Sequence, residues 1–75
     1  MTFILEVKHE TIERELIMKK LYVSNHKEDL IKKVYNLVSG VEKISDIHYR
    51  AHLGNKILEF LIYPVEVIGG VENGE

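Results

Sequence analysis

Residues 24–40 read SNHKEDLIKKVYNLVSG, and this segment says more about the fold than any other part of the chain. Its large aliphatic residues recur at the spacing of one face of an α-helix: Leu30, Val34, Leu37 and Val38. Ser24 or Asn25 can cap the first turn with a side-chain oxygen, and Gly40 can take the left-handed conformation that ends a helix. We therefore predict an amphipathic helix from about Asn25 to Ser39, with its apolar face buried.

Strand-like segments precede this helix. Residues 2–8 alternate apolar and charged side chains, which is the period of a half-buried strand. Residues 12–23 fit either a strand or a helix. The sequence Leu21-Tyr22-Val23 favours a strand, joined to the first by a turn near residues 9–11. The helical alternative leaves only a thin apolar stripe, and it stays open here.

Strand patterns return after the helix. Residues 44–53 alternate again and predict one strand, and Gly54-Asn55 can supply the positive φ angles of a two-residue hairpin turn. Residues 56–63 then run back as another strand. Pro64 lacks a hydrogen-bond donor for the sheet, so it predicts an edge or a bulge. Gly69-Gly70 is expected to end the fold.

Together these segments predict an α+β fold: a single antiparallel β-sheet with one amphipathic helix packed on one face, in the order β-β-α-β-β. We expect one domain over residues 1–70 and a flexible acidic tail over residues 71–75. Five apolar residues alternate with the helix-facing set and should lie on the opposite sheet face: Ile4, Ile17, Leu21, Ile57 and Leu61. Such a patch predicts a homodimer, which would also supplement the small core of a 75-residue chain.

The amino-acid composition indicates the class of protein and the cellular compartment to expect. The chain is 45% hydrophobic and has no cysteine, so it predicts a globular core without disulfides or thiolate metal sites, in a reducing compartment such as the cytoplasm. No apolar run approaches the roughly 18 to 20 residues that span a bilayer, and Glu6 comes too early for a signal peptide. We expect no membrane partner and a cytoplasmic location.

Residue types suited to catalysis are sparse. His48 and His52 are four apart in a predicted strand, which puts them roughly 13 Å from one another, too far to bind one metal ion. The chain lacks cysteine, offers no serine beside an evident base, and has no glycine-rich phosphate loop ahead of a helix. We therefore expect a non-enzyme with no catalytic, cofactor-binding or metal site, and no cofactor.

Charge is segregated along the chain, although the net charge is only −2. Residues 16–56 hold eight bases and four acids, whereas residues 57–75 hold four acids and no base. If both chain ends meet in one sheet, they would form an acidic surface that imitates the phosphate charge of DNA and blocks a basic DNA-binding protein. The acids expected to contact that partner are Glu10, Glu13, Glu15, Glu59, Glu66 and Glu72.

In size and composition alone, the chain resembles the small cysteine-free early proteins of phages, which act by occupying a host protein. No motif identifies a family. This resemblance implies a small protein-binding modulator, a phage-type inhibitor of a host protein. The alternative is a weak nucleic-acid-binding module that uses Lys27, Lys32 and Lys33 of the helix with Arg50, although an isoelectric point near 6.1 speaks against it.

Overall fold

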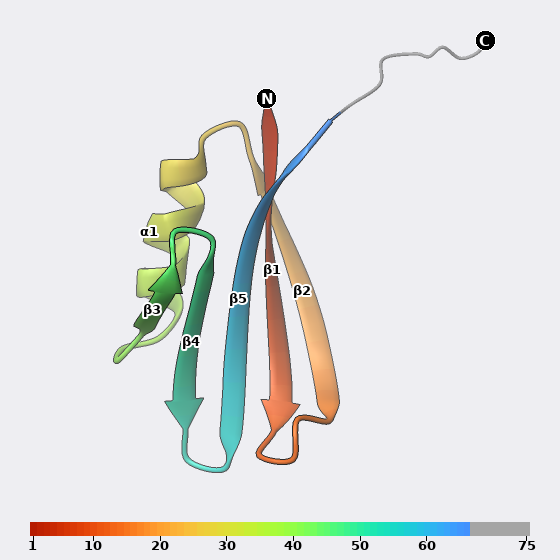
Figure 1. The fold of residues 1–75 in the computed structure, drawn as a ribbon, viewed down its shortest axis with the longest axis vertical. Coiled ribbons are helices and arrows are strands. Elements are labelled where there is room, and N and C mark those ends of the chain that lie inside the picture. Colours follow the sequence, from red (N-terminus) through yellow and green to blue (C-terminus); the bar gives the residue numbers. More distant parts are fainter. Residues whose placement is uncertain (67–75) are drawn as a thin grey trace, which may run out of the picture.

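The structure is a computed structural model, and it describes residues 1–66. It confirms the α+β class: one antiparallel sheet carries one helix on one side (Figure 1). The elements in chain order are β1 (Thr2–Thr11), β2 (Leu16–Ser24), α1 (Lys27–Leu37), β3 (Glu42–Ser45), β4 (His48–Leu53) and β5 (Lys56–Val65). The predictions about Gly69-Gly70 and the 71–75 tail lie outside the described residues.

The sheet has five strands where the sequence predicted four, and its spatial order is β2-β1-β5-β4-β3. The prediction of one strand over residues 44–53 is wrong, because the chain reverses direction at Asp46 and Ile47 and pairs β3 with β4. The Ser45 side-chain oxygen accepts a hydrogen bond from the Ile47 amide at 3.2 Å, a local bond typical of serine in turns. Lys43 and Asp46 close the same turn with an ion pair at 3.1 Å.

The first hairpin confirms the strand interpretation of residues 12–23, although its turn is displaced. β1 continues to Thr11, so the turn occupies residues 12–15, and its prediction near residues 9–11 is wrong. The Thr11 hydroxyl oxygen accepts a hydrogen bond from the Glu15 backbone amide at 3.1 Å, and this bond spans the turn. Arg14 adopts a left-handed backbone with φ of 72°, which is uncommon for a residue other than glycine.

Helix α1 is shorter than predicted at both ends. His26 stands at the N-cap position without a side-chain capping bond, so neither Ser24 nor Asn25 caps the helix. Ser24 acts earlier: its hydroxyl oxygen accepts from the His26 amide at 3.1 Å and its hydroxyl donates to Asp29 in the first turn at 3.2 Å. Gly40 has the predicted left-handed backbone, with φ of 71°, three residues after the helix ends.

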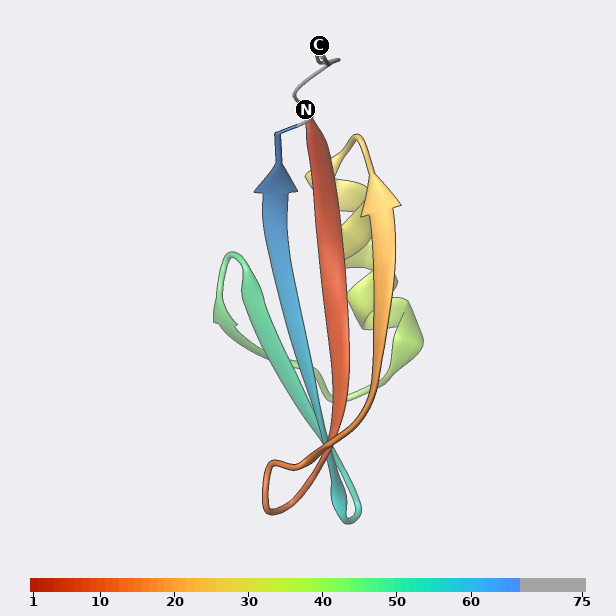
Figure 2. The ribbon, with the colours of Figure 1, turned by 90° about the vertical axis from the view of Figure 1, so that its right-hand side faces the viewer.

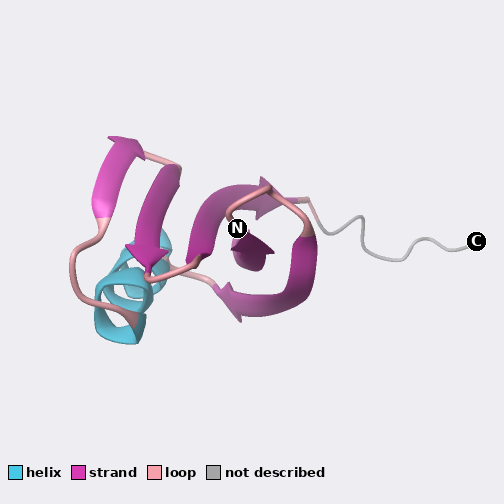
Figure 3. Cartoon of the chain, turned by 90° about the horizontal axis from the view of Figure 1, so that it is seen from below, coloured by secondary structure: helices cyan, strands magenta, loops and turns pink. Residues whose placement is uncertain are grey.

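The core lies between α1 and one face of the sheet (Figure 2). Leu30 and Val34 supply the buried part of the predicted helical stripe, whereas Leu37 remains 39% exposed at the end of the helix. The largest fully buried side chains on the sheet are Leu5, Tyr49, Phe60 and Ile62. Seen along the strands, the sheet curls strongly and the helix occupies one side of it (Figure 3).

The β4–β5 hairpin confirms the turn expected at Gly54-Asn55, since Leu53 pairs with Lys56. Only Gly54 has a positive φ, 60°, so the turn needs one left-handed residue and not two. Pro64 lies inside β5, opposite Phe3 of β1. Because the pairing of β4 with β5 stops at Leu61, β5 has a single strand neighbour at Pro64 within the described part of the chain, which is the edge environment that proline requires.

Within residues 1–66, the structure contains no helix that is both long enough and apolar enough to cross a membrane.

Candidate protein-interaction surface

The sheet face opposite α1, here called the outer face, is organised by the strand register into rows that cross β2, β1, β5 and β4. The first row holds Val23, Ile4 and Tyr63, and the second Leu21, Glu6, Leu61 and His48. The third row holds Lys19, Lys8, Glu59 and Arg50, and the fourth Leu16, Glu10, Ile57 and His52. Apolar residues therefore gather near the Val23 end, and charged residues cross the middle.

All five residues predicted for a dimer interface belong to this outer face, by register or by strand alternation. Their exposure differs widely. Ile57 is only 6% exposed, and Ile4 and Leu61 are half-buried, whereas Ile17 and Leu21 are 54% and 55% exposed. Because charged side chains separate them in the second, third and fourth rows, the five residues do not form one continuous apolar patch.

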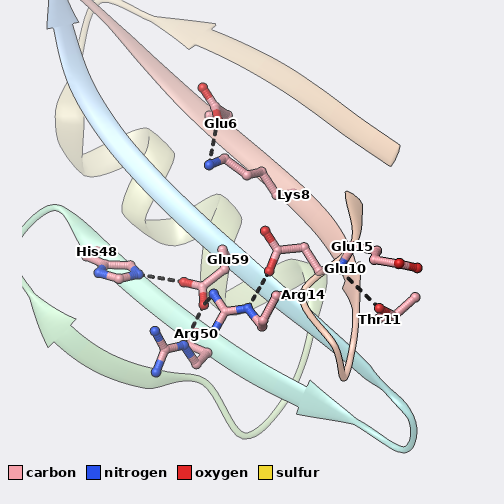
Figure 4. A network of polar contacts seen from close by, with 9 residues as sticks. All are labelled: Glu6, Lys8, Glu10, Thr11, Arg14, Glu15, His48, Arg50 and Glu59. Carbon is pink, nitrogen blue, oxygen red and sulfur yellow. Dashed lines mark hydrogen bonds and ion pairs between the residues drawn. The ribbon is translucent and has the colours of Figure 1, made fainter. Parts of the chain in front are cut away.

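A buried carboxylate, Glu59, organises the middle of the outer face (Figure 4). It is 4% exposed and accepts hydrogen bonds from Arg50 Nε at 2.6 Å and from Arg14 Nη2 at 2.5 Å. His48 Nε2 lies 2.5 Å from the other oxygen of the same carboxylate. Arg14 also donates through Nε to Glu10, at 2.7 Å, so one guanidinium links two carboxylates.

Strand pairing explains most of this cluster. Glu59 lies on β5, with Arg50 directly opposite it on β4, and Arg14 reaches over from the β1–β2 turn. Burial alone would raise the pKa of Glu59, but the hydrogen bonds from His48 and Arg50 and the nearby arginine charges lower it below its usual value. Glu59 is therefore ionised at neutral pH and holds three segments of the outer face together.

The predicted acidic residues do not converge. Glu10 and Glu59 are buried and neutralised by arginine, so they contribute little to an exposed acidic surface. Glu13 and Glu15 lie in the β1–β2 turn, beyond the end of β1 at which Thr11 pairs with Lys56. Glu66 follows β5 at the opposite end, where Thr2 pairs with Val65, and Glu72 lies outside the described residues.

The predicted basic residues are also divided between surfaces. Lys27, Lys32 and Lys33 belong to α1, whereas Arg50 lies on the outer face and is bound to Glu59. The Lys33 ammonium lies over the Tyr22 ring, 4.9 Å from its centre, in a cation–π contact. The four bases do not form the single nucleic-acid face that the sequence suggested.

Strand β2 presents an exposed apolar edge that was not predicted from the sequence. Among residues 1–66 it pairs only with β1, and it so forms one edge of the sheet over nine residues. Five of its apolar side chains are 42–64% exposed, and Tyr22 is partly buried against the core; the five are Leu16, Ile17, Met18, Leu21 and Val23. The opposite edge strand, β3, has only four residues and a single large apolar side chain, Ile44. The two sheet edges are therefore unequal.

Both faces of β2 contribute to this apolar edge. Met18 pairs with His9 and Tyr22 with Leu5, which puts them on the helix side of the sheet. Ile17 and Leu21 lie on the outer face, and a bulge opposite Glu10 shifts Leu16 there as well. Apolar residues at consecutive positions in 16–18 and 21–23 were the available signal, because a half-buried strand needs them only at alternate positions.

Among residues 1–66 there is no group of three or more histidine, aspartate or glutamate side chains arranged to hold a metal ion. Comparison of the chain with protein-family models, curated proteins and solved structures finds no match.

Proposed function

We propose that this chain is a small protein-binding module of a reducing compartment such as the cytoplasm, and that it binds its partner along β2. The observation that carries the proposal is the long edge strand β2, which is hydrogen-bonded to a strand on one side and exposes five apolar side chains. Long apolar edges with unpaired backbone groups are sites at which another chain can add a strand.

The distribution of the apolar side chains supports strand addition over packing against one face. Ile17, Leu21 and Val23 lie on the outer face, and Met18 lies on the helix side. A partner that covers only the outer face would leave Met18 in water. An added strand contacts neighbouring side chains on both faces of the sheet, so it covers all four and also satisfies backbone groups of β2.

A modulator of this kind acts by occupying its partner, which fits the inhibitor role predicted from the size and composition of the chain. The proposal does not include acidic DNA mimicry, because two of the acids expected to contact a basic partner, Glu10 and Glu59, are already paired with Arg14. It also differs from the homodimer predicted through the outer face, where Ile57 is already buried in the single chain.

Site-specific photocrosslinking tests the proposal. A photoreactive residue would replace Val23, which is 64% exposed on β2, and in a matched control it would replace the exposed Lys32 on α1. In cells of the native source, we expect a discrete crosslinked protein from the Val23 position and not from the Lys32 position. Crosslinks only between copies of this chain would favour the homodimer, and equal crosslinking from both positions would refute binding along β2.

A further inference from the structure

Two adjacent lysines occupy the middle of the exposed edge. Lys19 pairs with Lys8 of β1, and Lys20 pairs with Val7, so the two ammonium groups lie on opposite faces of the sheet. Within residues 1–66, neither Lys19 nor Lys20 forms an ion pair. Like charges directly opposite one another destabilise a strand pair, and although the Lys8 ammonium lies 3.6 Å from a Glu6 carboxylate oxygen, Lys19 has no acid directly across from it on β1.

The helix side of the edge is also positive. Burial, followed by the positive charges of Lys20 and Lys56, lowers the pKa of His9 below its usual value. Lys20 and His9 also line a pocket of about 230 Å³ near the end of α1, and no acidic side chain lines it. The middle of β2 therefore combines an open strand edge with positive charge on both faces.

A second copy of this chain is a poor occupant of the edge. An antiparallel β2–β2 pair that uses all nine residues, Leu16–Ser24, centres on Lys20, so symmetry sets Lys20 of one copy opposite Lys20 of the other. That arrangement repeats the like-charge repulsion at the centre of the new interface. An acidic strand would reverse the sign of the same interaction.

We propose that the strand added to β2 is an extended segment of a different protein, with acidic residues opposite Lys19 and Lys20 and apolar residues on either side of them. In an antiparallel pair the flanking apolar residues would meet Leu16 and Met18 at one end and Leu21 and Val23 at the other. The inference rests on the proposed function, and it adds the chemical class of the partner segment.

Two synthetic peptides test the inference. One is the capped nonapeptide TVTVEEVTV, and the other replaces its two central glutamates with glutamines. Each is titrated into isotope-labelled full-length protein while the amide resonances are followed by NMR. We expect shifts concentrated in β2, with the acidic peptide bound about tenfold more tightly, as two partly exposed charge pairs would give. The preference should shrink as salt is added.

Matched variants assign the effect to the two lysines. Lys19→Gln with Lys20→Gln should abolish the preference for the acidic peptide, whereas Lys27→Gln with Lys32→Gln on α1 should preserve it. Lys19 and Lys20 are exposed, and the amide spectrum of each variant reports whether it is folded. Equal binding of both peptides, or a preference that survives in the β2 variant, would overturn the acidic-segment inference and leave strand addition intact.

A third result would also overturn the inference. If neither peptide shifts the β2 amides while the Lys19→Gln, Lys20→Gln variant self-associates in sedimentation, the lysines serve only to keep the edge from pairing with other copies. Photocrosslinking from Val23 still tests binding along β2 independently, because crosslinking does not depend on the charge of the partner.

Discussion

At the scale of single residues, Glu59 is the side chain whose hydrogen bonds should contribute most to the stability of the outer face. A nearly buried carboxylate that accepts two arginine hydrogen bonds would leave several donors without a charged partner if its own charge were removed. We expect Glu59→Gln to lower the free energy of unfolding by about 1–3 kcal/mol. Urea denaturation measures the change, and Glu13→Gln, in the exposed β1–β2 turn, should stay within about 0.5 kcal/mol of the parent.

The stabilisation by Glu59 should depend on pH in a defined direction. Its pKa is lowered from the ordinary 4.5 in the folded chain, so its contribution is present above about 4.5 and is lost as pH falls through the lower folded value. The difference in stability between the parent and Glu59→Gln should therefore shrink on acidification below pH 4.5. Urea midpoints measured across this range test the point, and a constant difference would contradict it.

His9 offers a second titration, on the other side of the sheet. Because burial, Lys20 and Lys56 lower its pKa from 6.5, the folded state binds this proton less readily than the unfolded state. The chain should therefore lose stability as pH falls below about 6.5. Lys20→Gln should raise the pKa of His9, as an NMR titration would show, whereas Lys32→Gln on α1 should leave it unchanged.

At the scale of elements, the helix depends on a few buried contacts. Val34 has no exposed surface and faces the sheet core beside Leu30. Val34→Ala should cost about 2 kcal/mol through lost apolar burial and the cavity that remains. Val34→Asp should unfold the domain, because its carboxylate would be buried in the apolar core cluster. Circular dichroism during urea titration measures both changes, and Asn36→Ala on the exposed side of α1 should have little effect.

Local signals explain which elements could be predicted from sequence. The existence of α1, with Leu30 and Val34 buried, and the position of the Gly54 turn depend on neighbouring residues, so the sequence predicts both, whereas the predicted stripe residues Leu37 and Val38 lie at the end of the helix and beyond it. The Asp46–Ile47 reversal was missed because residues 44–53 keep a period of two on either side of it. The β1–β2 turn was misplaced because it contains no glycine and forces Arg14 into a left-handed backbone.

The candidate surface was predictable only in part. A two-residue turn at Gly54-Asn55 pairs Leu53 with Lys56 and therefore places Arg50 opposite Glu59, so this ion pair could have been derived from the hairpin register. The contact of Arg14 with Glu59 spans 45 residues of sequence and depends on the misplaced turn. The exposure of β2 depends on strand order, which places β1 and not β2 beside β5.

At the scale of the whole molecule, the asymmetry of the sheet edges determines where another chain can pair. The described part is elongated, 49 × 25 × 17 Å, because β1 and β5 each run for ten residues. β3 leaves an edge of only four residues, with an ion pair at its turn, whereas β2 leaves an edge of nine. Short charged edges resist strand pairing and long apolar ones permit it, so β2 is the edge open to a partner.

The charge on β2 also predicts how self-association depends on salt. If Lys19 and Lys20 oppose pairing between copies, sedimentation at low salt should find a monomer, and added salt should increase self-association by screening the repulsion. Lys19→Thr with Lys20→Thr should associate even at low salt, since threonine favours strands and removes the charge. A dimer formed through the outer face behaves differently: it would exist at low salt and be disrupted by Leu61→Lys on β5. Because β1 lies between β5 and β2, that variant should not affect edge pairing, and its result separates the two modes of assembly.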